Sequence, residues 1–245
     1  MKKQLIGLFF VAFVILTGCG MDYSDVPYLE GTVEPKAAET SSSIDYEASI
    51  ERFDILPKNS GGYYYKAIVE IKNTGSENIY TKGETFDIED SSGHLIQSDQ
   101  PVSLCPDVIL PGETGYLYTT FGKELSSNAD INDIVLNPQF IVKSTGVTPH
   151  DYPVNDLSLK EDTYGLTAVG RITNDTEEDV GLLYIQVLYY DYDGKIIGIS
   201  GTNLTDLLAG RTMSFEISGI GLPDDVNMGT VGRYVIIARD TFYGF

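Results

Sequence analysis

An internal repeat constrains the fold of this chain more than any other feature of its sequence. Ile71-Lys72-Asn73-Thr74 recurs as Ile172-Thr173-Asn174-Asp175, 101 positions further along. The same offset relates five more pairs without a gap: Ile79 and Val180, Asp90 and Asp191, Gly93 and Gly194, Leu95 and Ile196, and Ile96 and Ile197. Pro111-Gly112-Glu113 and Ala209-Gly210-Arg211 also correspond once three residues are removed. Because self-similarity at a fixed period marks a repeated structural unit, we expect two related domains, at residues 44–146 and 150–245.

From Ile44 onward the sequence has the pattern of β-strands. Short runs of alternating apolar and polar residues, such as those at 67–71 and 166–172, are separated by turns rich in Gly, Asn, Asp and Pro. No segment shows a convincing helical period of 3.6 residues. About seven short strands per hundred residues are typical of an antiparallel sandwich. The sequence therefore predicts an all-β protein with two tandem immunoglobulin-like antiparallel β-sandwich domains.

The residues that match between the repeats are those that turns require. Asn73 and Asn174 each follow the apolar end of a strand, and an Asn side chain turns the chain by bonding to its own backbone. Asp90-Ser91-Ser92-Gly93 and Asp191-Tyr192-Asp193-Gly194 each close a predicted hairpin, in which Gly takes the positive φ that the turn needs. We therefore expect the two repeats to turn at the same places.

This string of residues resembles the FxLYD domain, a β-sandwich module of bacterial and archaeal surface proteins that is often found in lipoproteins. The five-residue name corresponds to Phe86-Asp87-Ile88-Glu89-Asp90 in the first repeat and to Val187-Leu188-Tyr189-Tyr190-Asp191 in the second. The resemblance is stronger in the second repeat, and the first fits a generic immunoglobulin-like domain as well. It implies a sandwich fold and an extracellular setting, and it implies no catalytic residues.

The N-terminus has the pattern of an export signal. Lys2 and Lys3 give a positive start, and the uncharged apolar run at residues 5–16 is too short to cross a bilayer as a helix. Leu16-Thr17-Gly18-Cys19 resembles the lipobox of bacterial lipoproteins. That resemblance implies a lipoprotein signal peptide at residues 1–18, cleavage before Cys19, and lipidation that anchors Cys19 to the extracytoplasmic face of the cell membrane. The alternatives are an ordinary cleaved signal and a single anchoring helix with an incidental cysteine.

The acidity of the chain limits its partners. Residues 19–43 are rich in Asp, Glu, Ser, Thr and Pro without an apolar period, so we expect a flexible acidic linker after the lipidated cysteine. Without Lys2 and Lys3, 14 Lys and Arg stand against 36 Asp and Glu, which gives a net charge of −22. Such a surface repels phosphate backbones, and nucleic acid is excluded as a partner.

No set of catalytic or metal-binding residues can be assembled from the sequence. His94 and His150 are the only histidines, so neither a zinc site nor a His-based triad is expected. Asp191-Tyr192-Asp193-Gly194 begins like a calcium loop, but Lys195 stands where an oxygen ligand belongs and Thr202 where a bidentate Glu belongs. Weak calcium binding by acidic loops stays open. We expect no metal site and no cofactor.

Cysteine usage points to a protein without disulfides. Once Cys19 is acylated, Cys105 is the only thiol left, so no intramolecular disulfide can form. A lone cysteine is a candidate nucleophile only with a histidine partner. We therefore expect a buried, unreactive Cys105 and no enzymatic activity.

The aromatic residues suggest an interaction surface, since the chain has 17 Tyr and no Trp. The strand at 182–190 is apolar on both faces except at Gln186. One face must be core, and the other is either covered by the neighbouring domain or presented as a patch of the kind in which Tyr is favoured. The candidate surface comprises Tyr63, Tyr65, Leu182, Tyr184, Leu188 and Tyr190.

These features favour a non-enzymatic cell-surface lipoprotein that serves as a protein-binding or scaffolding module of the bacterial envelope. Its partner would be an envelope protein or a cell-wall component. The alternative is a lipoprotein that binds a small ligand or glycan and is accessory to a transporter or polysaccharide system. The two differ in shape, because ligand capture needs a concave pocket with convergent polar groups and partner binding needs a flat patch.

Overall fold

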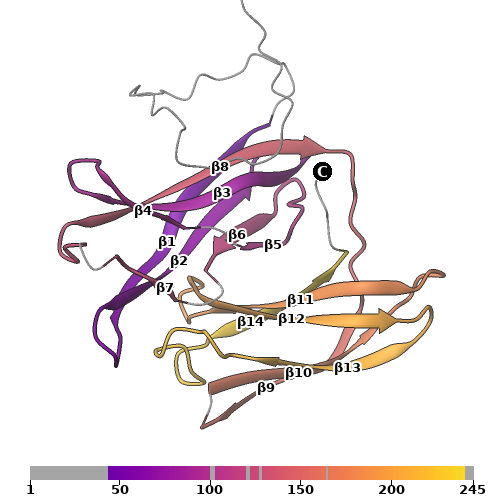
Figure 1. The fold of residues 1–245 in the computed structure, drawn as a ribbon. Helices are drawn as coiled ribbons and strands as arrows, with labels where there is room; N and C mark the ends of the chain where they lie inside the picture. Colours follow the sequence, from indigo (N-terminus) through magenta and orange to yellow (C-terminus); the bar gives the residue numbers. More distant parts are fainter. Residues whose placement is uncertain (1–43, 100–102, 120–121, 127–128, 164, 241–245) are drawn as a thin grey trace, which may run out of the picture. The chain divides into compact units, whose positions relative to one another are not determined.

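A computed structural model describes residues 44–99, 103–119, 122–126, 129–163 and 165–240 (Figure 1). The predicted signal peptide, the predicted lipidation site Cys19 and the predicted acidic linker lie outside the described residues. The described chain is all β, as predicted: it forms 14 strands and four antiparallel sheets. None of the described residues belongs to a helix that is long and apolar enough to span a membrane.

The first eight strands, β1 to β8, make one sandwich, which we call the first sandwich. One of its sheets has the order β1-β2-β6-β5, with β7 also paired to β2, and the other has the order β4-β3-β8. The bounds are β1 (Tyr46–Pro57), β2 (Tyr63–Asn73), β3 (Asn78–Asp90), β4 (Leu95–Asp99), β5 (Ser103–Cys105), β6 (Thr114–Tyr118), β7 (Lys123–Glu124) and β8 (Ile134–Thr145).

The remaining six strands make the second sandwich with the same strand order. Its sheets run β13-β10-β9 and β12-β11-β14, so β9, β10 and β13 take the places of β1, β2 and β6, and β11, β12 and β14 take those of β3, β4 and β8. The bounds are β9 (Val154–Asp162), β10 (Gly165–Thr173), β11 (Val180–Tyr190), β12 (Ile196–Leu207), β13 (Thr212–Ser218) and β14 (Arg233–Arg239).

Each sandwich has its own hydrophobic core between its two sheets. Inward-facing residues alternate along the strands, as the period of two predicts. The first core is built mainly from β2, β3 and β6, and its buried residues include Tyr65, Val69, Ile71, Phe86, Ile88 and Leu117. The second is built mainly from β10, β11 and β13, and its buried residues include Leu166, Ile172, Ile185, Val187, Tyr189 and Ile217.

The predicted repeat is visible in the bonds of its two asparagines. The side-chain amide of Asn73 is fully buried and donates to Glu77 O at 2.8 Å and Ile109 O at 3.0 Å, while its Oδ1 accepts from the Gly75 N–H at 3.0 Å. The second sandwich repeats all three bonds at the same distances: the amide of Asn174 donates to Glu178 O and Leu207 O, and its Oδ1 accepts from the Thr176 N–H. The asparagines therefore fasten the turn and also hold a distant segment against it.

The two hairpins match in the same way. The Asp90 carboxylate accepts from the backbone N–H groups of Ser92 at 2.9 Å and His94 at 3.0 Å. Asp191 accepts in the same way from Asp193 and Lys195, both at 2.9 Å. The glycine of each turn has the positive φ that was expected, 85° at Gly93 and 83° at Gly194.

Candidate functional site

The apolar outer faces of two sheets meet in a third hydrophobic cluster, which we call the junction. From the first sandwich it takes Ile68, Tyr116 and Tyr118, on the face of β2 and β6 that points away from the core. The second sandwich contributes residues of β11 and β12, namely Leu188, Tyr190, Ile196 and Ile199. Two hydroxyls also approach across it, since Tyr116 Oη and Tyr190 Oη lie 3.4 Å apart. The junction therefore joins the two sandwiches through buried, mainly apolar surface.

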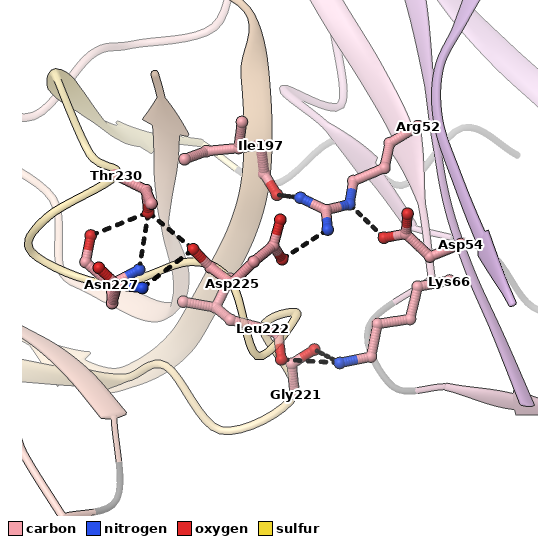
Figure 2. A network of polar contacts seen from close by, with 9 residues as sticks. All are labelled: Arg52, Asp54, Lys66, Ile197, Gly221, Leu222, Asp225, Asn227 and Thr230. Carbon is pink, nitrogen blue, oxygen red and sulfur yellow. Dashed lines mark hydrogen bonds and ion pairs between the residues drawn. The ribbon is translucent and has the colours of Figure 1, made fainter. Parts of the chain in front are cut away.

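A β-bulge places a cation at one end of the junction. The register of β1 on β2 shifts between Ile50 and Arg52, and such a bulge re-aims the side chains that follow it. Arg52 consequently stands opposite Ile68, on the face that meets the second sandwich. Its guanidinium donates to Ile197 O at 2.9 Å and to Asp225 Oδ1 at 2.6 Å, and it also pairs with Asp54 (Figure 2). Burial lowers the pKa of Arg52, but the bonds to both carboxylates outweigh it and the pKa is raised overall.

A buried lysine lies beside this arginine. Lys66 is 8% exposed, and its Nζ donates to Gly221 O at 2.8 Å and to Leu222 O at 2.7 Å in the second sandwich (Figure 2). Burial lowers the pKa of this lysine because it disfavours the charged form. A buried cation is tolerated only when it is well bonded, so the two carbonyls make Lys66 specific to this docked arrangement.

Arg239 forms a clamp at the other end of the junction. Its guanidinium holds Glu113 of the first sandwich through two bonds of 2.9 and 3.1 Å, and it reaches Val108 O at 3.2 Å. It also holds Asp151, in the segment that enters β9, through bonds of 2.6 and 3.0 Å. Paired bonds of this kind fix direction as well as distance, and the clamp therefore ties the first sandwich, the connecting segment and β14 together.

The structure separates the six residues predicted as an interaction surface. Tyr63 and Tyr184 are partly exposed, at 37% and 39%, and Leu182 is half-buried. The prediction is wrong for Tyr65, which is fully buried in the first core because it shares the inward face of β2, and its hydroxyl donates to Asp99. Leu188 and Tyr190 are 3% and 8% exposed inside the junction, so of the two alternatives for this face of the strand the structure shows cover by the neighbouring sandwich.

A cleft of about 460 Å³ opens beside the clamp and is lined by both sandwiches. Glu113 and Thr114 of the first sandwich form one wall. The second sandwich contributes Tyr152, Leu188, Tyr190 and the consecutive β14 residues 235–239. Volume and lining resemble those of small-ligand sites, which are mostly apolar with a few polar groups.

The remaining predicted residues have structural surroundings. Cys105 is buried as predicted, and burial raises the pKa of its thiol well above the usual value. His94 lies in its hairpin beside Asp90, and His150 Nε2 is 2.7 Å from Asp175 Oδ1. Within the part of the chain that the structure describes, no three His, Cys, Asp or Glu side chains gather as a metal site would require.

Sequence reasoning missed the three cations that fix the junction, Arg52, Lys66 and Arg239. A signal was present only for Lys66, which lies in a strand between Tyr65 and Ala67, where a charge needs a partner. The partners could not be found from the sequence, because Asp225 is 173 residues from Arg52 and Leu222 is 156 residues from Lys66.

No protein-family model matches this chain, and a search of curated proteins also finds no match.

Proposed function

We propose that this chain is a non-enzymatic protein-binding or scaffolding module of the bacterial envelope, anchored by a lipid at Cys19. The lipobox resemblance supports the anchor, and the resemblance to FxLYD domains of surface proteins supports an extracytoplasmic location. The partner would be an envelope protein or a cell-wall component.

The observation that carries the proposal is the docking of the two sandwiches, whose buried, mainly apolar junction is also bonded across its boundary at Arg52, Lys66 and Arg239. Glu113 and Arg239 face each other across the boundary at 2.9 Å, so the cleft exists only while the sandwiches stay docked. Docking before the partner arrives lowers the ordering cost of binding, which is a property that a presenting surface needs.

Chemical cross-linking of the anchored protein in intact cells, followed by mass spectrometry, tests this proposal. We expect one abundant envelope protein to be joined to residues around the cleft, with few links to its neighbours in the membrane. The test variant is Leu188→Asp, which places a charge at a 3% exposed position of the junction. Because a buried charge without a partner is costly, this variant should lose the links to the partner while its lipid anchor remains. Self-links and lipid neighbours alone, in the unaltered protein, would contradict the proposal.

One observation favours a second function, the capture of a small ligand or glycan. The cleft is concave, its volume lies within the range of small-molecule sites, and Arg239, Glu113 and Asp151 bring polar groups to its rim. These groups already bond to one another, so they have less capacity to orient a ligand. The protein-binding function is therefore preferred.

A further inference from the structure

β14 is the edge strand of its sheet, and among the residues that the structure describes only one end of its free side is paired. β11 runs along the other side over its whole length. On the free side, the segment before β9 makes a single antiparallel bridge at Arg239, where the Tyr152 N–H donates to Ala238 O at 2.8 Å. That segment leaves β14 at Pro153, because β9 begins at the next residue and pairs with β10 instead.

The rest of the free side has main-chain groups to offer. Along an antiparallel strand, the N–H and C=O groups of alternate residues point to the same side. Since Ala238 bonds on the free side, Ile236 and Tyr234 also direct their backbone groups there. No strand among the described residues pairs with them, which leaves two donors and two acceptors for an added strand.

This edge lacks the protection that edge strands usually have. Proteins commonly blunt a free edge with a lysine, a proline or a covering element, because an apolar edge recruits other strands. Between its terminal arginines β14 reads Tyr-Val-Ile-Ile-Ala, and residues 234–237 are only partly buried. The strand is thus apolar and uncharged along its middle, and no described strand covers its free side.

In the first sandwich, the equivalent edge strand β8 carries a proline. In the repeat, Phe86 of β3 corresponds to Val187 of β11, 101 residues later. Phe86 pairs with Pro138 of β8, whereas Val187 pairs with Ile236 of β14. Proline has no N–H and is confined to edges, so Pro138 blunts β8 at the position where β14 has an open amide.

The open edge lies along the cleft rather than on a featureless surface. Residues 235–239 line the cleft, Leu188 and Tyr190 give it an apolar wall, and Glu113 and Asp151, both paired with Arg239, lie at its edge. The net charge of the chain is −20, and a field of that sign attracts positively charged partners.

We propose that the free edge of β14 accepts an extended, positively charged segment of a partner protein as an added β-strand. Main-chain bonds to Ile236 and Tyr234 would supply affinity, and the apolar wall would select alternate side chains of the segment. This inference rests on the protein-binding function proposed above and names the kind of partner segment that the cleft takes.

Selection from a displayed library of random nine-residue peptides, with the purified full chain as target, tests the inference. We expect the enriched peptides to alternate apolar residues and to carry Lys or Arg. Ile236→Pro should weaken their binding by about ten-fold or more, because it removes an edge donor and blocks strand approach. The control is Pro138→Ile, the reverse change at the equivalent position of the first sandwich, which should leave binding unchanged.

Hydrogen exchange on the unaltered chain gives a second readout that needs no variant. The amides of Tyr234 and Ile236 should exchange fast in the free protein and become protected when a selected peptide is added, while those of Val235 and Ile237 stay protected throughout. Protection of Tyr234 and Ile236 in the free protein would overturn the inference, as would failure to enrich any peptide. Peptides whose binding ignores Ile236→Pro would overturn it and leave the protein-binding function standing, which the cellular cross-links decide separately.

Discussion

The two buried asparagines show how a single side chain can fasten both a turn and a long-range contact. The turn was predictable, because Asn commonly accepts a bond from the backbone two residues on, and the Gly75 N–H supplies it. The bond from Asn73 to Ile109 O was not predictable, since a partner 36 residues away is fixed by the fold and not by the local pattern. Buried polar groups of this kind are costly to leave unpaired.

Replacing either asparagine by alanine should destabilise the protein by a similar amount. Asn73→Ala and Asn174→Ala each leave two carbonyls without their donor, and we expect a loss of about 1–3 kcal/mol in the free energy of unfolding. Because each sandwich has its own asparagine, the double variant should lose about the sum. Asn203→Ala, at an exposed position of β12, is the control and should change stability by less than about 0.5 kcal/mol in denaturant titrations. Unequal losses would mean that the repeats do not share this device.

Strands with two apolar faces organise the contact between the sandwiches. The period of two predicted that one face of β11 is core, and Val187 and Tyr189 lie there. It left open whether the other face is covered, and the structure places Leu188 and Tyr190 of that face in the junction. The choice could not be made from the sequence, because the packing of one sheet on another depends on register and on the bulge before Arg52, neither of which the pattern encodes.

Acid should loosen the clamp between Glu113, in the turn before β6, and Arg239 of β14. Burial raises the pKa of Glu113, but its bonds to Arg239 outweigh that effect and the pKa is lowered overall. A carboxyl group with a lowered pKa in the folded state stabilises the fold above its ordinary pKa of about 4.3 and loses that contribution as the pH falls through the folded value. The unaltered protein should therefore lose more stability between about pH 5 and pH 3 than Glu113→Gln does.

Denaturant titrations at several pH values measure this difference. The control is Glu216→Gln, at an exposed position of β13, whose pH profile should follow that of the unaltered protein. Parallel curves for Glu113→Gln and the unaltered protein would show that the clamp contributes nothing.

The two repeats differ in the surface residues that form the junction between the sandwiches. The junction joins the outer face of β2 and β6 to the outer face of β11, so it uses different sheets of the two repeats. Such a contact could propagate to further copies, since it is not self-complementary. The equivalent faces of the other repeat are polar instead. Leu188 and Tyr190 of β11 correspond to Asp87 and Glu89 of β3. In the same way, Tyr116 and Tyr118 of β6 correspond to Ser214 and Glu216 of β13. The contact between repeats is therefore confined to the pair within one chain.

The sequence predicted the sandwiches and their repeat but not how they are fixed to each other. The repeat offset, the turns and the inward residues follow from local patterns, and all are found in the described residues. The cleft could not be predicted, because its walls come from segments more than a hundred residues apart, such as Glu113 and Arg239.

Calorimetry of the full chain tests most directly whether the two sandwiches act as one body. We expect a single cooperative unfolding transition in the unaltered protein. Leu188→Asp should split it into two, because the carboxylate would be buried in the junction, whereas Tyr184→Asp on the same face should not, since Tyr184 is 39% exposed. Two transitions in the unaltered protein, or one unchanged transition in Leu188→Asp, would contradict the docked arrangement on which the shared cleft depends.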